Sequence, residues 1–269
     1  LIDFSSSIFF STFFTSNFFF NNIGHDYGDA LSITKPFLHT WSLSVEEQFY
    51  ILYPLFFFCC FKFIKNKLLI LLISISVLSL ALAQYGSINF SISNFYLLPT
   101  RIWEIFCGAI LVVMNSNKNN NKFSKDIFSY IGLTLVLLSF YFFTDDTLHP
   151  SFKTVIPVFG TMLVIRFSNN NFISRILSHK LLVFIGLISY SLYLWHYPIF
   201  SFSEMLGFDS SNINKIIFIF ISFFLSIISY FIIEKKFRNK KLISNRLFFF
   251  YLITSLMIIS IFTFLVYKE

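Results

Sequence analysis

The chain has 269 residues, of which 56% are hydrophobic and only 12% are charged, and phenylalanine alone contributes 42. Soluble domains average about 25% charged residues, so this composition excludes an ordinary soluble protein and predicts a membrane protein. The net charge of +7 comes without a basic face carrying interleaved aromatics, so nucleic acid is not expected as a partner. Three cysteines and the lack of metal-binding spacings predict neither a disulfide framework nor a metal site.

Nine apolar runs come close to the length of about 20 residues that a helix needs to cross a bilayer. They cover approximately residues 1–22, 44–64, 67–85, 97–114, 127–144, 153–167, 181–206, 213–233 and 246–267. The predicted fold is therefore all-α, a polytopic transmembrane helix bundle of about nine spans. It is expected to form one domain over residues 1–269, surrounded by membrane lipids.

The basic residues gather in alternate loops, as short cytoplasmic loops require. Fifteen of the 20 lie there: Lys62, Lys65, Lys67, Lys118, Lys122, Lys125, Arg166, Arg175, Lys180, Lys235, Lys236, Arg238, Lys240, Lys241 and Arg246. The intervening loops hold Asp26, Asp29, Asp145, Asp146, Glu204 and Asp209. This pattern predicts a multi-pass protein of the inner (plasma) membrane, with residue 1 near the cytoplasm and an extracytoplasmic C-terminus.

Two adjacent carboxylates stand where the second predicted span begins, in "PFLHTWSLSVEEQFYILYP" (36–54). Ionisable groups are costly near lipid and suggest a functional site. Glu47 has a second interpretation, because Ser44-Val-Glu-Glu47 fits a capping box with Ser44 as N-cap. That interpretation leaves Glu46 unexplained.

Other polar residues are predicted at the same outer depth. The three-residue spacing of Arg101 and Glu104 puts them on one face of the fourth span, where they suit a functional site. The alternative is that they form an ion pair only to lower the cost of their burial. His196 falls in the outer third of the seventh span, where it could belong to a functional site. The alternative is that it is part of an aromatic belt at the membrane interface, beside a helix end kinked at Pro198. The hydroxyl groups of "YS" (190–191) also suit contacts between helices.

Four segments resemble, in this order, the acyltransferase-3 family of integral membrane O-acyltransferases: "HTWSLSVEEQFYILYPL" (39–55), "RIWEIFCGAIL" (101–111), "ISYSLYLWHYPIF" (188–200) and "FIIEKKFR" (231–238). The resemblance covers essentially the whole chain. It implies acylation, usually acetylation, of sugars of lipopolysaccharide, capsule, peptidoglycan or related surface polysaccharides. Acetyl-CoA or another acyl-CoA would be the co-substrate, and a cell-surface glycan or lipid-linked sugar the acceptor.

The resemblance implies a bundle of ten or eleven helices. In that family, the first helix carries an Arg that is followed eleven positions later by the His regarded as catalytic. No such pair occurs here, because no Arg precedes Arg101 and the first His is His25. The nine runs resemble helices three to eleven of the eleven-helix branch, and we expect no SGNH-type extracytoplasmic domain after the last of them. We therefore expect a member without its first two helices, and expect residues 1–269 alone to insert without transferring an acyl group.

The catalytic base is thus left unassigned, and the remaining polar residues are expected to bind substrate or support the site: His39, Trp41, Ser42, Glu46, Glu47, Arg101, Glu104, Tyr190, Ser191 and His196. A base near the outer face would deprotonate the sugar hydroxyl, and inner cations would steer the donor phosphates. Two alternatives remain open, a transporter or flippase of a glycan or acid, and an inactive partial gene product. The prolines show none of the symmetry of transporter repeats.

Overall fold

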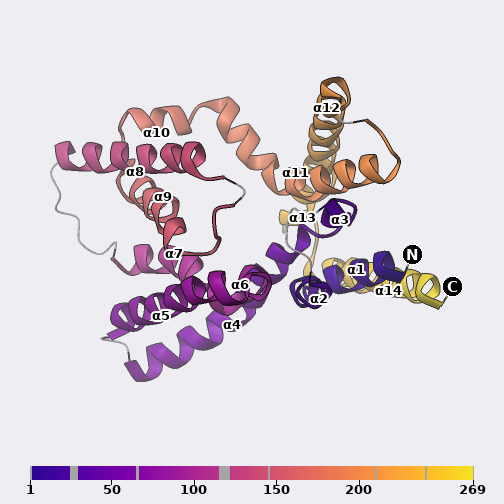
Figure 1. Ribbon diagram of the computed structural model, residues 1–269, viewed down its shortest axis with the longest axis horizontal. Helices are drawn as coiled ribbons and strands as arrows, with labels where there is room; N and C mark the ends of the chain where they lie inside the picture. Colours follow the sequence, from indigo (N-terminus) through magenta and orange to yellow (C-terminus); the bar gives the residue numbers. More distant parts are fainter. Residues whose placement is uncertain are drawn as a thin grey trace. The chain divides into compact units, whose positions relative to one another are not determined.

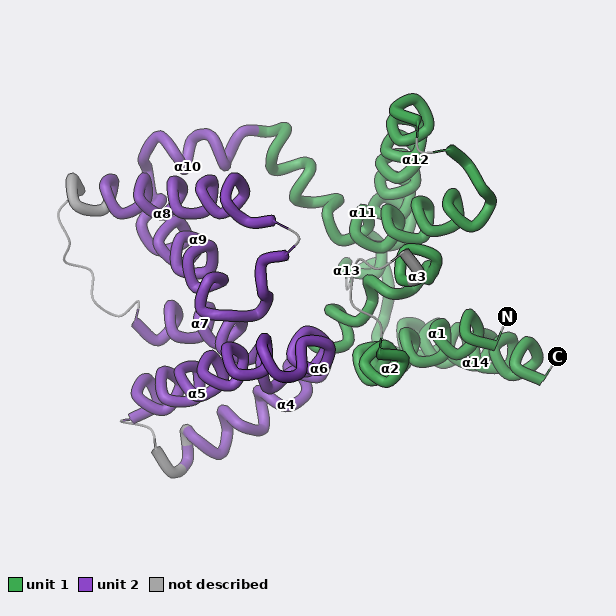
Figure 2. The backbone as a smooth tube through the Cα atoms, viewed as in Figure 1, with its two compact units in different colours: residues 1–45, 180–269 green, residues 46–179 purple. Residues whose placement is uncertain are grey.

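The computed structural model describes residues 2–24, 30–64, 67–114, 122–144, 146–209, 211–239 and 241–268, and within these ranges every regular element is a helix (Figure 1). The prediction of an all-α fold is confirmed. The chain divides into two compact units, coloured separately in Figure 2. Unit 1 comprises residues 1–45 and 180–269, and unit 2 comprises residues 46–179.

Unit 1 begins with two short helices, α1 (Ile2–Thr12) and α2 (Ser16–Ile23), instead of one helix over 1–22. The chain breaks at Phe14, whose φ of 54° lies in the left-handed region that ends helices. At 1.5 Å per residue, α1 is only about 16 Å long, so it does not cross a bilayer of about 30 Å by itself. The predicted first span is therefore wrong as one continuous helix.

The short helix α3 (Ala30–Ile33) is followed by α4 (Thr40–Ile64), which starts five residues earlier than a capping box with Ser44 as N-cap requires. Ser44 is fully buried inside α4, where its hydroxyl lies 2.8 Å from the Ser16 hydroxyl and accepts a bond from the Ser16 amide at 3.2 Å. Thr40 also contacts this group, since its hydroxyl donates to Ser16 at 3.0 Å. Ser44 therefore joins α4 to α2, and the capping-box interpretation is wrong.

The rest of unit 1 is formed by α11 (Lys180–Met205), α12 (Asn212–Ser229), α13 (Lys235–Arg238) and α14 (Asn245–Lys268). A π-helical turn over Tyr230–Glu234 joins α12 to α13. Helix α11 packs against α12, and α14 packs against α1. Pro198 lies inside α11, which continues to Met205, in agreement with the predicted run over 181–206.

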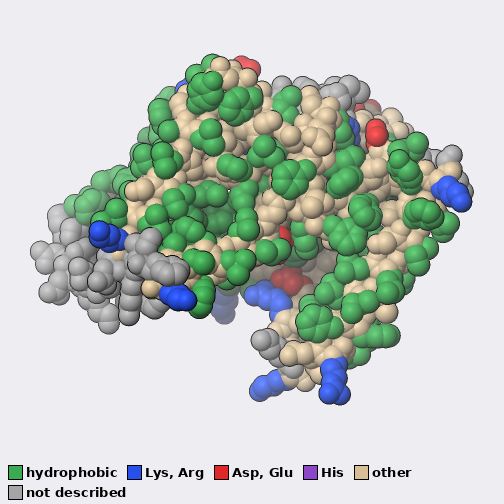
Figure 3. Space-filling model, turned by 90° about the horizontal axis from the view of Figure 1, so that it is seen from below, with side chains coloured by type: hydrophobic (Ala, Val, Ile, Leu, Met, Phe, Trp, Pro, Cys, Tyr) green, Lys and Arg blue, Asp and Glu red, His purple; other side chains and the backbone are tan. Residues whose placement is uncertain are grey.

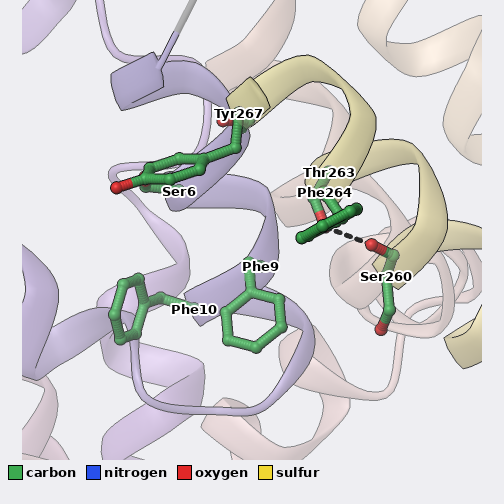
Figure 4. A pocket seen from close by; sticks show the side chains of 8 residues that line it. Ser6, Phe9, Phe10, Ser260, Thr263, Phe264 and Tyr267 are labelled. Carbon is green, nitrogen blue, oxygen red and sulfur yellow. Dashed lines mark hydrogen bonds between the residues drawn. The ribbon is translucent and has the colours of Figure 1, made fainter. Parts of the chain in front are cut away.

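The contact between α1 and α14 is lined by aromatic rings and small hydroxyl side chains. Figure 4 shows Phe9 and Phe10 of α1 on one side and Phe264 and Tyr267 of α14 on the other, around a pocket of about 360 Å³. The Thr263 hydroxyl makes its hydrogen bond within α14, where it donates to the Ser260 carbonyl at 3.0 Å. The small residues allow the two helices to approach closely, as in many helix pairs within membranes.

The described residues of unit 2 form the rest of α4 and six further helices: α5 (Leu68–Asn89), α6 (Ser91–Tyr96), α7 (Ile102–Met114), α8 (Lys122–Phe142), α9 (Val155–Phe167) and α10 (Phe172–Leu177). Short 3₁₀ turns over Leu98–Thr100 and Phe152–Thr154 precede α7 and α9. Helix α8 packs along α9, and α5 along α7. Fully buried apolar side chains such as Leu72 and Ala83 form the core.

Within the described residues, four helices are long and apolar enough to cross a membrane, namely those over Leu68–Asn89, Lys180–Met205, Asn212–Arg238 and Asn245–Lys268. Two shorter apolar helices cover Ile102–Met114 and Asp126–Phe142. Large hydrophobic side chains are exposed along these helices. On the face shown in Figure 3, hydrophobic side chains are far more numerous than charged ones. A multi-pass membrane protein follows, because water-exposed apolar patches of this extent are rare in soluble monomers. The count of nine spans stays a prediction.

The predicted orientation is tested by thiol labelling of intact cells. Several of the loop charges lie outside the described residues, including Asp26, Asp29, Lys65, Lys118, Asp145 and Lys240. In a variant whose native cysteines are replaced by alanine, we expect a membrane-impermeant reagent to label Leu148→Cys and not Lys122→Cys. A tag placed after Glu269 should be accessible from outside. Labelling at position 122 with protection at position 148 would reverse the orientation.

Candidate functional site

His39 lies in a buried cluster of aromatic rings in unit 1, directly before α4. Its side chain is 1% exposed, and its ring stacks on Tyr197 with centroids 5.2 Å apart and an interplanar angle of 23°. The rings of Tyr193 and His196 approach its edge or face at 5.2 Å and 5.8 Å. One face of α11 thus supplies three rings around the imidazole of His39, because positions 193, 196 and 197 are neighbours on a helix.

Hydrogen bonds from α11 hold the backbone at His39. The Tyr193 hydroxyl donates to the His39 carbonyl at 2.5 Å and lies 2.5 Å from the Ser42 hydroxyl. The Tyr197 hydroxyl donates to the Ser32 carbonyl at 3.2 Å. His196 instead bonds within its own helix, with Nδ1 3.1 Å from the Leu192 carbonyl. The cluster is therefore built on the start of α4 and the middle of α11, and rings and backbone fix the orientation of His39.

Burial lowers the pKa of His39 to about 4, the neighbouring His196 adds to the effect, and the Pro36 backbone oxygen opposes it. The ring is therefore neutral at pH 7. In the unfolded chain it titrates near 6.5, so the stabilisation from a neutral His39 is complete above that pH and is lost as the pH falls towards 4. Among the described residues, neither ring nitrogen has a hydrogen-bond partner of good geometry.

His39 also lines a cavity of about 550 Å³ within unit 1, which is in the usual size range of small-molecule sites. Tyr190, Ser191 and Trp195 line it from α11, and Glu234 lines it from the π-helical turn. Ser191 is buried and donates to Glu234 Oε2 at 3.1 Å. His196 lines a neighbouring cavity of about 390 Å³ on another side of α11. The walls are apolar apart from these few polar groups, as is typical of sites that fix a ligand's orientation.

A second polar cluster lies in unit 2, around Arg101. The guanidinium donates from Nε to the Phe95 carbonyl at 3.0 Å, and its carbon lies 4.8 Å from the centre of the Phe95 ring. Its Nη1 lies 3.5 Å from Glu104 and 2.8 Å from His149 Nε2. Because an arginine only donates, His149 Nε2 must accept and the ring must be neutral. Burial, with the Arg101 charge as a smaller cause, lowers the pKa of His149 to about 4.

The loop before α9 places His149 against Arg101. Asn94 Nδ2 donates to the Pro150 carbonyl at 3.0 Å, and the Gln84 side-chain oxygen accepts the Phe152 amide at 2.9 Å. Ser151 and Thr154 then cap the 3₁₀ turn with reciprocal bonds. The positive charge of Arg101 is thus compensated by Glu104, a carbonyl, a ring face and a neutral imidazole.

The structure groups the predicted residues by unit. His39, Ser42, Tyr190, Ser191 and His196 meet around α11 in unit 1, and Trp41 packs in the core there with 8% of its surface exposed. Arg101 and Glu104 form the expected ion pair in unit 2. Glu46 is exposed and Glu47 half-buried on α4. Their shared predicted depth also suggests Arg101 as a charge partner of Glu46 or Glu47, and this pairing stays a prediction.

Two residues of these clusters were missed by the sequence analysis. His149 stands in the predicted outer loop directly before Pro150, at the depth assigned to Arg101, and that shared depth was the available signal. Glu234 lies within "FIIEKKFR", where the neighbouring basic residues predict a cytoplasmic loop and not a site residue. Only the π-helical turn, which re-aims residues within a helix, directs it towards Ser191.

Comparison with known proteins agrees with the resemblance in the sequence. The family model for the acyltransferase domain of the acyltransferase-3 family matches residues 4–235, which include parts of both units. The peptidoglycan O-acetyltransferase OatA of Listeria monocytogenes is 31% identical over 70% of this chain and 33% of its own length. A putative O-acetyltransferase of Staphylococcus aureus strain COL is 30% identical over 85% of this chain and 40% of its own length.

The O-acetyltransferase OatA of Staphylococcus aureus is 31% identical over 71% of this chain and 34% of its own length. The chain thus spans about a third to two fifths of the length of these curated relatives. No solved structure matches it. Since the family model covers most of the chain, the protein belongs to the acyltransferase-3 family.

Proposed function

We propose that this protein takes part in the O-acetylation of a cell-surface glycan, with acetyl-CoA or another acyl-CoA as donor. The observation that carries the proposal is the family match over residues 4–235, together with relatives whose names describe O-acetyltransferases. One of those relatives is named for peptidoglycan, so the proposed acceptor is a hydroxyl group of a glycan. The expected cytoplasmic donor and external acceptor require a polar passage through a membrane-embedded bundle.

In this reaction the oxygen of a sugar hydroxyl bonds to the acyl carbon, the carbon–sulfur bond of the thioester breaks, and the hydroxyl proton ends on the released thiol. The proton must be taken up by a base, which we leave unassigned. His39 is suited to hold the acceptor, because its neutral ring has an acceptor nitrogen and lines the cavity of unit 1. Tyr190, Ser191 and Trp195 shape that cavity, and Tyr193 fixes the His39 backbone.

Deleting the gene from its host is expected to lower the O-acetyl ester content of the surface glycan, measured as acetate released by mild base. On the chromosome, His39→Gln should lower acetyl transfer about tenfold, the effect of losing roughly one hydrogen bond. In isolated membranes, the part of the activity that needs neutral His39 should persist from pH 7 to about 5 and fall as the pH approaches 4.

The matched control is His179→Gln, which changes an exposed histidine in the turn before α11 and should leave transfer unchanged. Unchanged O-acetyl content after deletion would overturn the proposed function. A normal rate in His39→Gln, with loss on deletion, would remove His39 alone from the site. If deletion reduces the amount of glycan and not its acetyl groups per sugar, a transporter is the better description.

A further inference from the structure

Another pocket, of about 660 Å³, opens in unit 1 where the π-helical turn meets α13. Three of its lining residues are cations, Lys235, Arg238 and Lys241, and the others are Leu187, Tyr230 and Asn239. Like charges that share one hollow repel each other, and a bound anion would relieve that repulsion. We call this the basic pocket. It lies in the segment that the charge pattern predicts to be cytoplasmic.

Glu234 links the basic pocket to the cavity that His39 lines. Its Oε1 is 3.1 Å from Arg238 Nη1, and its Oε2 accepts the Ser191 hydroxyl at 3.1 Å. The Glu234 side chain is only 16% exposed, whereas that of Arg238 is 69% exposed. The carboxylate therefore stands in the wall between the two spaces and offers a partner to one of the three cations. A guanidinium has five N–H donors, more than one carboxylate oxygen uses.

The two spaces follow each other along α11. Leu187 lines the basic pocket, while Tyr190 and Ser191 line the cavity about one helical turn, or roughly 4.5–6 Å, further on. Beyond them the cavity is bounded by apolar groups, including Leu194, Pro198 and Ile233. An elongated molecule with an anionic end and a weakly polar arm matches this order of cations followed by an apolar space.

We propose that the basic pocket binds the phosphate end of such a molecule, that the adjoining cavity takes its arm, and that Glu234 is the positioning residue between them. Phosphate is the matching anion, because its oxygens accept from Arg and Lys together. Two sources carry this chemistry, a nucleotide thioester and a phospholipid headgroup. Identifying the ligand as the acyl-CoA donor rests on the proposed function, whereas the phosphate site itself does not.

The probes are pyrophosphate and CoA, titrated calorimetrically into the full chain in nanodiscs of phosphatidylcholine. We expect Arg238→Gln and Lys241→Gln each to weaken binding of both probes by about tenfold, as loss of a charged contact does. Glu234→Gln should tighten pyrophosphate binding several-fold, because it removes the internal anion that competes for Arg238. The matched control is Lys236→Gln, an exposed cation of α13 that does not line the basic pocket.

The lipid source is tested by native mass spectrometry in nanodiscs that contain phosphatidylglycerol. If CoA fails to bind but phosphatidylglycerol is retained by the wild type and lost in Arg238→Gln, the phosphate site stands with a lipid as its ligand. Equal weakening in Lys236→Gln and Arg238→Gln would overturn the site, since unspecific charge would explain it. Failure of both probes and of phosphatidylglycerol would also overturn it. Loss of O-acetylation on gene deletion is scored separately, so each proposal fails independently.

Discussion

Arg101→Ala is expected to destabilise the protein by about 3–5 kcal/mol, the typical effect of removing one member of a buried ion pair. The variant leaves Glu104 in an apolar site without its partner at 3.5 Å, and it removes the donors to His149 and to the Phe95 carbonyl. Arg101→Lys should recover only part of the loss, because a single ammonium does not reproduce the planar fork. The measurement is the thermal midpoint of the purified protein in detergent, followed by tryptophan fluorescence.

The control for this prediction is Arg175→Ala, which removes an exposed arginine from α10 of the same unit. Exposed charges contribute about 0–1 kcal/mol, so this midpoint should stay close to that of the wild type. Equal midpoints for Arg101→Ala and Arg175→Ala would show that the Arg101 cluster does not stabilise unit 2. Lost glycan acetylation at a normal midpoint would instead place Arg101 in the substrate site.

Gly132→Ala is expected to destabilise unit 2, although alanine is the better helix former by about 1 kcal/mol. A Cβ at position 132 would lie 2.6 Å from the Gly160 carbonyl oxygen and 2.8 Å from the Leu163 Cβ. These atoms belong to α9 and yield only if α8 and α9 separate, which costs about 1–3 kcal/mol or more. Gly160→Ala should behave alike, since its Cβ would lie 2.8 Å from the Gly132 carbonyl oxygen.

Gly108 of α7 offers the matched control. A Cβ there meets nothing within 4 Å, so Gly108→Ala gains helix propensity without a clash. The same substitution should therefore lower the thermal midpoint at position 132 and leave it unchanged or higher at position 108. A midpoint for Gly132→Ala at or above that of the wild type would contradict the close α8–α9 crossing.

Composition and hydropathy were sufficient for the fold class and for most helix positions. The predicted runs over 67–85, 181–206 and 246–267 correspond to α5, α11 and α14, because a chain in lipid must satisfy its backbone within each helix. The motifs were sufficient for the family, which the match over residues 4–235 confirms. The three-residue spacing also predicted the ion pair between Arg101 and Glu104.

The sequence was misleading where a local pattern competed with packing. The capping box at Ser44 failed because its hydroxyl is used by Ser16, 28 residues earlier in the chain. The break at Phe14 does not interrupt the apolar run, since Phe13 and Phe14 are themselves apolar. Hydropathy averages over a run, whereas one left-handed residue is enough to end a helix.

The sequence by itself thus determined that the protein is a helical membrane protein, which family it belongs to and which polar residues are candidates for the site. Only the tertiary structure decided which of them meet: His39 with Tyr193, His196 and Tyr197, and Glu234 with Ser191 and Arg238. These partners are separated by up to 158 positions and lie in different elements of the chain, since His39 stands directly before α4 and Glu234 in the π-helical turn. Periodicity reports the face of one helix at a time, so contacts between helices depend on how side chains fill the space between them.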